Sequence, residues 1–307
     1  MRPLRDRTPG KIHLLTCRTR SSELLLVPSS CLNNLVGGII AKYSNMHGID
    51  IYSVSVLSNH YHILAKGKDI SLFEENINRE IAKRVNKLLS RKGSLWARRY
   101  DDQITVKELD ALEGLLYVIT NPVKHGLVTH PKHWPGLNTY KQTLGAKAKE
   151  YTFFNFTEYN KARNKAKLTG EVVNRSDYET KYKLEIQKLK DHNLKEYNLE
   201  KLIEQRVRKL QREIRAEGKG FLGRKAILNQ KPRGEFPKKT SKSNRPICYT
   251  KCLKALANFK EELKIKLAQY KEASIRYRLG LPDFEFPPYC FYPPRHHMPK
   301  NHAFIHS

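Results

Sequence analysis

The stretch Val54-Ser-Val-Leu-Ser-Asn-His60-Tyr61-His62-Ile-Leu-Ala65 is the part of the sequence that best indicates the fold. Its β-branched and apolar residues predict a strand, because a helical pattern begins only near Ser71. Side chains on a strand alternate between its two faces, so His60 and His62 point the same way and Tyr61 points to the opposite layer. Two imidazoles on one face can share a cation, although paired histidines on a strand are more often only hydrogen-bonded.

A second motif is Tyr117-Val-Ile-Thr-Asn121-Pro-Val-Lys-His-Gly-Leu-Val128. Apolar residues at three- and four-residue spacing predict a helix that starts near Lys107 and that Pro122 ends. On this helix Tyr117 and Asn121 lie one turn apart on a stripe that is distinct from the apolar face. In isolation, a partly buried structural tyrosine and a capping asparagine would be the favoured explanation of the pair.

The same stripe contains Asp110, two turns before Tyr117, and Gly114, one turn before it. Because glycine has no side chain, Gly114 is expected to leave room for another group to approach Tyr117.

Together the two motifs resemble those of the single-tyrosine HUH transposases, and more closely those of the REP-associated tyrosine transposases. The resemblance covers roughly residues 1–145 and implies a ferredoxin-like βαββαβα antiparallel sheet of the α+β class. Further similar stretches are Arg2-Pro-Leu-Arg5, Leu95-Trp96-Ala-Arg98-Arg99-Tyr100-Asp101 and His133-Trp-Pro-Gly-Leu137.

The order of the sequence patterns agrees with this fold. It predicts an antiparallel sheet with its helices on one face, and a hairpin turn at Ser58-Asn59. The expected strands cover residues 11–19, 49–57, 60–66 and 95–106, and the expected helices cover residues 33–47, 71–89 and 107–121.

The resemblance also implies a reaction and the residues that perform it. Tyr117 would be the nucleophile, and His60, His62 and Asn121 would hold a divalent metal, Mg or Mn. The implied activity is cleavage and rejoining of single-stranded DNA at hairpin ends by transesterification, through a 5′-phosphotyrosine. A cation helps because it neutralises the phosphate oxygens and favours the phenolate. Tyr61, beside the histidines, is a less favoured rival nucleophile because the strand turns it away.

Contacts to the DNA backbone are expected from exposed guanidinium groups, and base stacking from Trp96 or Tyr100. A packing role in the core is the alternative for Trp96. The candidate arginines are Arg2, Arg5, Arg7, Arg18, Arg98 and Arg99.

Composition supports a polyanionic partner. The 307 residues include 58 Lys and Arg against 30 Asp and Glu, a formal net charge of +28. The five cysteines, an odd number at irregular spacing, predict reduced thiols and a cytoplasmic, nucleoid-associated protein. We expect no membrane association, because the sequence has no signal-peptide pattern and no apolar run of about eighteen residues.

The sequence suggests four regions. Residues 1–145 form the expected HUH domain, 146–197 a linker and helices, 198–280 a basic helical DNA-binding extension, and 281–307 a tail rich in Pro and His. In the extension, a helix over residues 198–216 is followed by a turn and a short basic helix. This outline resembles a helix-turn-helix, but a packing hairpin with a basic outer face fits it as well. The sequence leaves open a monomer or a homodimer.

The sequence is compatible with three functions. A mobile transposase is the first. A domesticated, non-mobile nickase that processes chromosomal palindromes is the second. A non-catalytic nucleic-acid-binding protein that retains the fold is the third, and the presence of Tyr117, both histidines and Asn121 argues against it.

Overall fold

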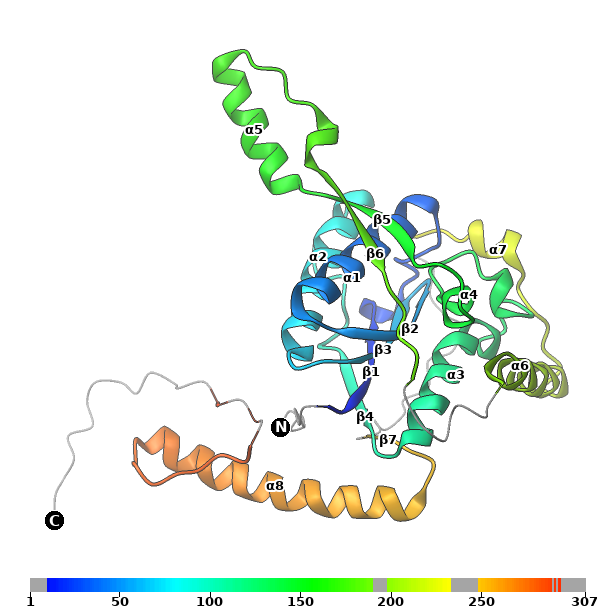
Figure 1. The fold of residues 1–307 in the computed structure, drawn as a ribbon, viewed down its shortest axis with the longest axis vertical. Helices are drawn as coiled ribbons and strands as arrows, with labels where there is room; N and C mark the ends of the chain where they lie inside the picture. Colours follow the sequence, from blue (N-terminus) through cyan, green and yellow to red (C-terminus); the bar gives the residue numbers. More distant parts are fainter. Residues whose placement is uncertain (1–9, 190–197, 233–247, 289, 291, 294–307) are drawn as a thin grey trace. The chain divides into compact units, whose positions relative to one another are not determined.

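The computed structural model describes residues 10–189, 198–232, 248–288, 290 and 292–293 (Figure 1). These residues belong to two compact units, one formed by Gly10–Tyr249 and the other containing the residues from Thr250 onward. The candidate residues Arg2, Arg5 and Arg7 lie outside the described residues.

The larger unit is built on a five-stranded sheet with the strand order β2-β3-β1-β4-β7. The first four strands are antiparallel, and β7 pairs in parallel with β4. The predicted α+β class and antiparallel βαββαβα order are therefore confirmed, with β7 added at the edge. The bounds of the strands are β1 Ile12–Arg18, β2 Asp50–Leu57, β3 His60–Lys66, β4 Asp101–Thr105 and β7 Cys248–Tyr249.

Helices cover both faces of this sheet. The helices α1 (Ser30–His47) and α2 (Ile70–Leu88) pack on the face that carries Tyr61 and Ile63. The helix α3 (Glu108–Lys124) packs on the other face, against Leu14 and Leu64. The prediction of helices on one face is thus wrong for α3, because the strands carry apolar side chains on both faces and both must be covered.

Two predicted boundaries are also wrong. The expected strand over residues 95–106 starts only at Asp101, because the chain before it makes a single bridge from Trp96 to Thr19. Pro122 does not end α3, which continues to Lys124. A proline in the last turn removes one backbone donor only, and its carbonyl still accepts a hydrogen bond from the Leu127 N–H at 3.0 Å.

A projecting segment, here called the arm, follows the sheet and its helices. It consists of the paired strands β5 (Lys149–Phe154) and β6 (Glu179–Leu184), with α5 (Phe156–Thr169) and a 3-10 turn (Arg175–Tyr178) between them. Figure 1 shows α5 extending away from α1 and α2. The two strands lie where the sequence predicted a linker and helices only.

The arm is attached to α1 by close packing. The Asn34 side chain donates to the Thr152 carbonyl at 2.9 Å and accepts from the Thr152 N–H at 3.0 Å. One turn along, the buried Tyr151 ring lies directly against Gly37, so close that a Cβ there would be 2.4 Å from a ring carbon. Glycine at residue 37 therefore makes room for the base of the arm.

The first part of the basic extension, over residues 198–232, packs on the sheet domain through its apolar side. Ile203, Val207 and Leu210 of α6 (Leu199–Ala216) are buried beside α3, and Ile227 of α7 (Arg224–Leu228) joins the same cluster. Both predicted helices are confirmed, and their apolar faces favour the packing-hairpin reading. The remaining short helices are the 3-10 turns Arg20–Ser22 and Pro131–His133 and α4 (Tyr140–Thr143).

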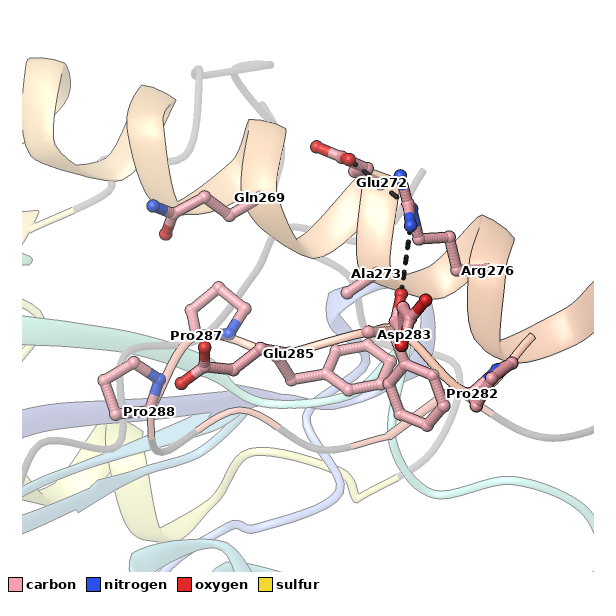
Figure 2. Close-up of a pocket in the computed structure, with 11 residues that line it drawn as sticks. Gln269, Glu272, Ala273, Arg276, Pro282, Asp283, Glu285, Pro287 and Pro288 are labelled. Carbon is pink, nitrogen blue, oxygen red and sulfur yellow. Dashed lines mark hydrogen bonds and ion pairs between the residues drawn. The ribbon is translucent and has the colours of Figure 1, made fainter. Parts of the chain in front are cut away.

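The second unit contains α8 (Leu253–Leu279) and the chain that folds back along it (Figure 2). Gly280 ends α8 in the left-handed conformation, with φ of 74°. Phe284 then packs on Tyr277 with ring centroids 5.3 Å apart, and Arg276 donates to the Asp283 carbonyl at 3.2 Å.

The described residues bear on the expectations for the cysteines and for membrane association. Cys17 and Cys31 are free thiols, as predicted. Within the described ranges, every helix is too short or too polar to cross a lipid bilayer.

Substitution of Gly37 tests how the arm is held. We expect Gly37→Ala to destabilise the protein by about 1–3 kcal/mol, because the new methyl group overlaps the Tyr151 ring. In a Tyr151→Ala background, the same change should be neutral or stabilising, because alanine is the better helix former. Urea unfolding of the four proteins measures this sign change. Equal destabilisation in both backgrounds would contradict the proposed packing.

Candidate functional site

The strand β3 presents His60 and His62 on the face that α3 covers. Both side chains are buried, and their ring centroids are 4.9 Å apart. His60 Nδ1 lies 2.6 Å from Asn59 Oδ1, and His62 Nδ1 lies 2.7 Å from Thr16 Oγ1. Because an amide oxygen only accepts, the Nδ1 of His60 carries the proton and its Nε2 offers a lone pair. His62 Nε2 has no hydrogen-bond partner.

Electrostatics keep both imidazoles neutral. Burial lowers the pKa of His60 well below its usual value, and the neighbouring His62, His125 and Arg18 lower it further. Burial also lowers the pKa of His62 to about 3, with contributions from His125, Lys124 and Arg18. Neutral imidazole is the form that binds metal ions. The pair is therefore in the ligand form over the physiological pH range.

The helix α3 places Asn121 and Tyr117 against the histidines. The Tyr117 and His62 ring centroids are 5.1 Å apart. Asn121 is fully buried, and neither its Oδ1 nor its Nδ2 makes a hydrogen bond of regular geometry, although the amide is close enough to raise the pKa of His60 and lower that of Tyr117. A buried amide without partners is unfavourable by about 1–3 kcal/mol, and native proteins retain few such groups. The unpaired atoms of Asn121 and His62 therefore indicate a ligand site.

The stripe with these residues faces the sheet rather than solvent. Asp110 is buried at its start, and a Cβ on Gly114 would lie 3.2 Å from Leu64 and 3.8 Å from Tyr249. The expectation that Gly114 leaves room beside Tyr117 is therefore corrected. The chain itself fills that space, and glycine allows α3 to approach the sheet closely.

Tyr117 is only partly buried, so part of its side chain remains accessible. Burial raises the pKa of Tyr117, whereas the Asn121 amide and the Arg18 guanidinium act in the opposite direction. The Lys124 ammonium lies 4.5 Å from the centre of the Tyr117 ring. Two cations thus lie close enough to favour a negatively charged phenolate or a bound phosphate.

Three further residues at the site were missed by the sequence reasoning. His125 packs edge-on against His60 with centroids 5.4 Å apart, Lys124 lies over Tyr117, and the Tyr249 ring centroid is 6.0 Å from that of Tyr117. His125 follows Asn121 by one helical turn, so the same four-residue spacing could have identified it. The assumption that Pro122 ends the helix concealed this signal.

The candidate arginines divide into two groups. Arg18 lies opposite His60 in the register of β1 and β3, and its charge acts on Tyr117 and on the histidines. Arg98 donates to Asp101 at 2.8 Å on an exposed loop, and Arg99 is exposed beside it. The structure therefore brings Arg18 to the site, and it places the loop with Arg98 and Arg99 beside Arg18, whose carbonyl accepts from the Ala97 N–H at 2.9 Å.

The aromatic candidates are held in the protein interior. Trp96 donates to the Asn78 carbonyl at 2.9 Å and packs on Tyr61, and Tyr100 is buried. Tyr61 faces α2, where its hydroxyl donates to Glu74 at 2.8 Å. Burial raises the pKa of Tyr61 far above its usual value, with the nearby Glu74 carboxylate adding to the effect. These features exclude Tyr61 from the histidine face.

The residues present fit a divalent cation. Among the described residues, no three His, Cys, Asp or Glu side chains form a metal-binding group. A site here would instead combine imidazole nitrogens with the unpaired Asn121 Oδ1, and would leave other coordination positions open. An amide oxygen is a ligand typical of Mg or Mn.

Solved structures of two transposases match part of this chain. No protein-family model and no curated protein matches the chain. A REP-associated tyrosine transposase bound to a REP hairpin shares 23% identity and a TM-score of 0.39, covering 46% of this chain and 84% of its own. A candidate transposase of Deinococcus radiodurans R1 shares 17% identity and a TM-score of 0.26, covering 33% of this chain and 84% of its own.

Replacing Asn121 tests whether its amide is retained for a ligand. We expect Asn121→Leu to raise the stability of the metal-free protein by about 1–2 kcal/mol, because it removes two unpaired buried atoms. The matched change Asn138→Leu should destabilise the protein, because the Asn138 amide donates to Ser55 and Ile119 and accepts from the Tyr140 N–H. Thermal unfolding in a chelator measures both. Destabilisation by both changes would argue for a structural role of Asn121.

Proposed function

We propose that the chain is a transposase of the REP-associated tyrosine type, which cleaves and rejoins single-stranded DNA at hairpin ends. The proposal rests mainly on one observation. A partly exposed tyrosine lies beside two neutral histidines and an unpaired buried amide, with Arg18 and Lys124 close by. A purely structural cluster would not need unpaired ligand atoms next to a tyrosine.

In the proposed reaction, the Tyr117 hydroxyl oxygen forms a bond to phosphorus as the bond from phosphorus to the 3′ oxygen breaks. The 5′ end remains on Tyr117, and the 3′ oxygen leaves as a hydroxyl after it accepts a proton. Attack by another 3′-hydroxyl on the phosphotyrosine reverses the step, so no nucleotide cofactor is consumed. Arg18 and Lys124 would hold the phosphate and offset its negative charge.

A divalent cation, when bound, would supply charge neutralisation at the phosphate oxygens and favour the phenolate. The two imidazoles, His60 and His62, would hold the cation through their Nε2 atoms, and Asn121 would hold it through its amide Oδ1. The hydrogen bonds of Nδ1 to Asn59 and Thr16 keep the two rings oriented for this role. Their neutral state removes proton competition at neutral pH.

DNA as the partner is supported by the net charge of +28 and by the exposed Arg18 next to the site. The transposase with the similar structure was solved with a REP hairpin, which suggests hairpin DNA as the first substrate to test. Recognition of a hairpin by this chain is part of the proposal.

The decisive experiment looks for a covalent adduct. Purified protein is mixed with end-labelled hairpin DNA and Mg or Mn, and the products are separated in denaturant. We expect an adduct that Tyr117→Phe abolishes and that His62→Ala reduces at least about a hundredfold. Tyr249→Phe and Tyr61→Phe are matched controls, because each removes a nearby tyrosine hydroxyl that the proposed reaction does not use.

The outcomes separate the three functional readings. An adduct that survives Tyr117→Phe would assign the nucleophile to another residue. Tight hairpin binding without any adduct would favour a non-catalytic nucleic-acid-binding protein. Adduct formation followed by strand joining fits both a mobile transposase and a domesticated nickase, and palindromes bounding the gene would distinguish them.

A further inference from the structure

A basic cavity lies between α1, α2 and the base of the arm. Its volume is about 230 Å³, and α1 and α2 cover the sheet face opposite His60 and His62, so the cavity is separate from the candidate site. Phe153, Phe156 and several polar side chains complete its wall. The charged side chains that line it are Lys42, Lys83, Arg84, Lys87 and Glu80.

The positive charges in this cavity are crowded together. The Lys42 ammonium and the Arg84 guanidinium lie 3.9 Å and 4.1 Å from the centre of the Phe153 ring. The Lys87 ammonium lies 4.2 Å from the Phe156 ring. The aromatic faces offset part of the repulsion between these cations.

Glu80 is the only acidic side chain in the wall, and it pairs with Arg84 at 2.9 Å. Within the described part of the chain, Lys42, Lys83 and Lys87 form no ion pair. Burial lowers the pKa of Lys42, an effect that Glu80 opposes and Arg84 increases. An anion bound here would relieve like-charge repulsion that the protein alone leaves uncompensated.

The cavity continues onto the exposed helix α5. Phe156, which lines the cavity, is also the first residue of α5, and no residue of α5 is buried. Glu158 is the single acidic residue of this helix. Its basic residues, all exposed, are Lys161, Arg163, Lys165 and Lys167. We call the cavity together with α5 the arm surface.

The extent of the arm surface indicates the kind of anion. A free phosphate would occupy the cavity only and would not explain four more cations on a projecting helix (Figure 1). Phosphates repeated along a nucleic acid backbone match both parts, and a double helix presents them at the highest density. Contacts of this type position a nucleic acid without reading its sequence.

We propose that the arm surface binds the sugar-phosphate backbone of the duplex stem of a hairpin, apart from the Tyr117 site. The hairpin as substrate rests on the proposed function. The stem would be held by the arm surface, while the single-stranded flank would be the part that reaches Tyr117. The arm surface would then contribute to affinity and to the choice of structured DNA.

Charge reversal on exposed lysines tests this assignment. The test variant is Lys83→Glu/Lys87→Glu, and the matched control is Lys11→Glu/Lys68→Glu, which changes the net charge equally at exposed residues outside the arm surface. Fluorescence anisotropy measures binding of a labelled hairpin with a single-stranded flank, and of the flank alone, at several salt concentrations. Inorganic phosphate alone is titrated by calorimetry. Circular dichroism checks folding.

We expect the test variant to bind the hairpin about tenfold or more weakly at about 100 mM salt, and to reduce the salt slope by about two. Its affinity for the flank alone should change by less than about threefold, and the control should bind both DNAs like the unmodified protein. A second variant, Lys165→Glu/Lys167→Glu, should also weaken hairpin binding, because these residues lie on α5.

Equal weakening by the test and control variants would overturn the proposal, because the effect would then be general electrostatics. Equal loss for hairpin and flank would assign the lysines to single-strand binding. Phosphate binding without any loss of hairpin affinity would assign the cavity to a free anion. Adduct formation at saturating DNA is measured in parallel, so a missing adduct with normal hairpin binding counts against the proposed function and not against the arm surface.

Discussion

The alternation of side chains along β3 is the constraint on which the rest of the molecule depends. Because β3 lies between β1 and β2 in a fixed register, His60 and His62 must face α3 while Tyr61 faces α2. A slip by one residue would exchange these roles and bury two imidazoles in the apolar layer. Thr16, opposite His62 on β1, fixes both the register and the orientation of the ring.

The same face shows how the protein accommodates polar groups beside a packed core. Gly114 brings α3 close to the sheet at Leu64, and Asn121, two turns further along α3, is fully buried. A low-polarity environment makes unpaired polar atoms unfavourable, and it also strengthens their interaction with any charge that enters. The unpaired atoms of Asn121 and His62 lower the free energy of unfolding. A ligand that pairs with these atoms restores that free energy, and this gain strengthens its binding.

Local patterns in the sequence predict those features of the fold that depend only on residues close together in the chain. Period-two alternation identifies the face of His60 and His62, and helical spacing pairs Tyr117 with Asn121. The positional rule for proline was misleading, because Pro122 sits in the last turn, where it removes a single hydrogen bond. The strands β5, β6 and β7 are short, and their existence depends on partners such as Gly37 and β4 that are distant in sequence. The place of Tyr249 beside Tyr117 could not be predicted from the sequence either, because it depends on the pairing of β7 with β4.

The basic extension is joined to the sheet domain by backbone and side-chain hydrogen bonds. The N–H groups of Leu222 and Gly223 donate to the carbonyls of Gly126 and Leu127, directly after α3, and Ser58 donates to Gln230 at 2.7 Å beside the turn that precedes His60. A stop codon after residue 145 would therefore leave a truncated product with an uncovered apolar side on α3. Loss of α6 and α7 would remove part of this core, so the packing of α3 against the face that carries His60 and His62 depends on residues far along the chain.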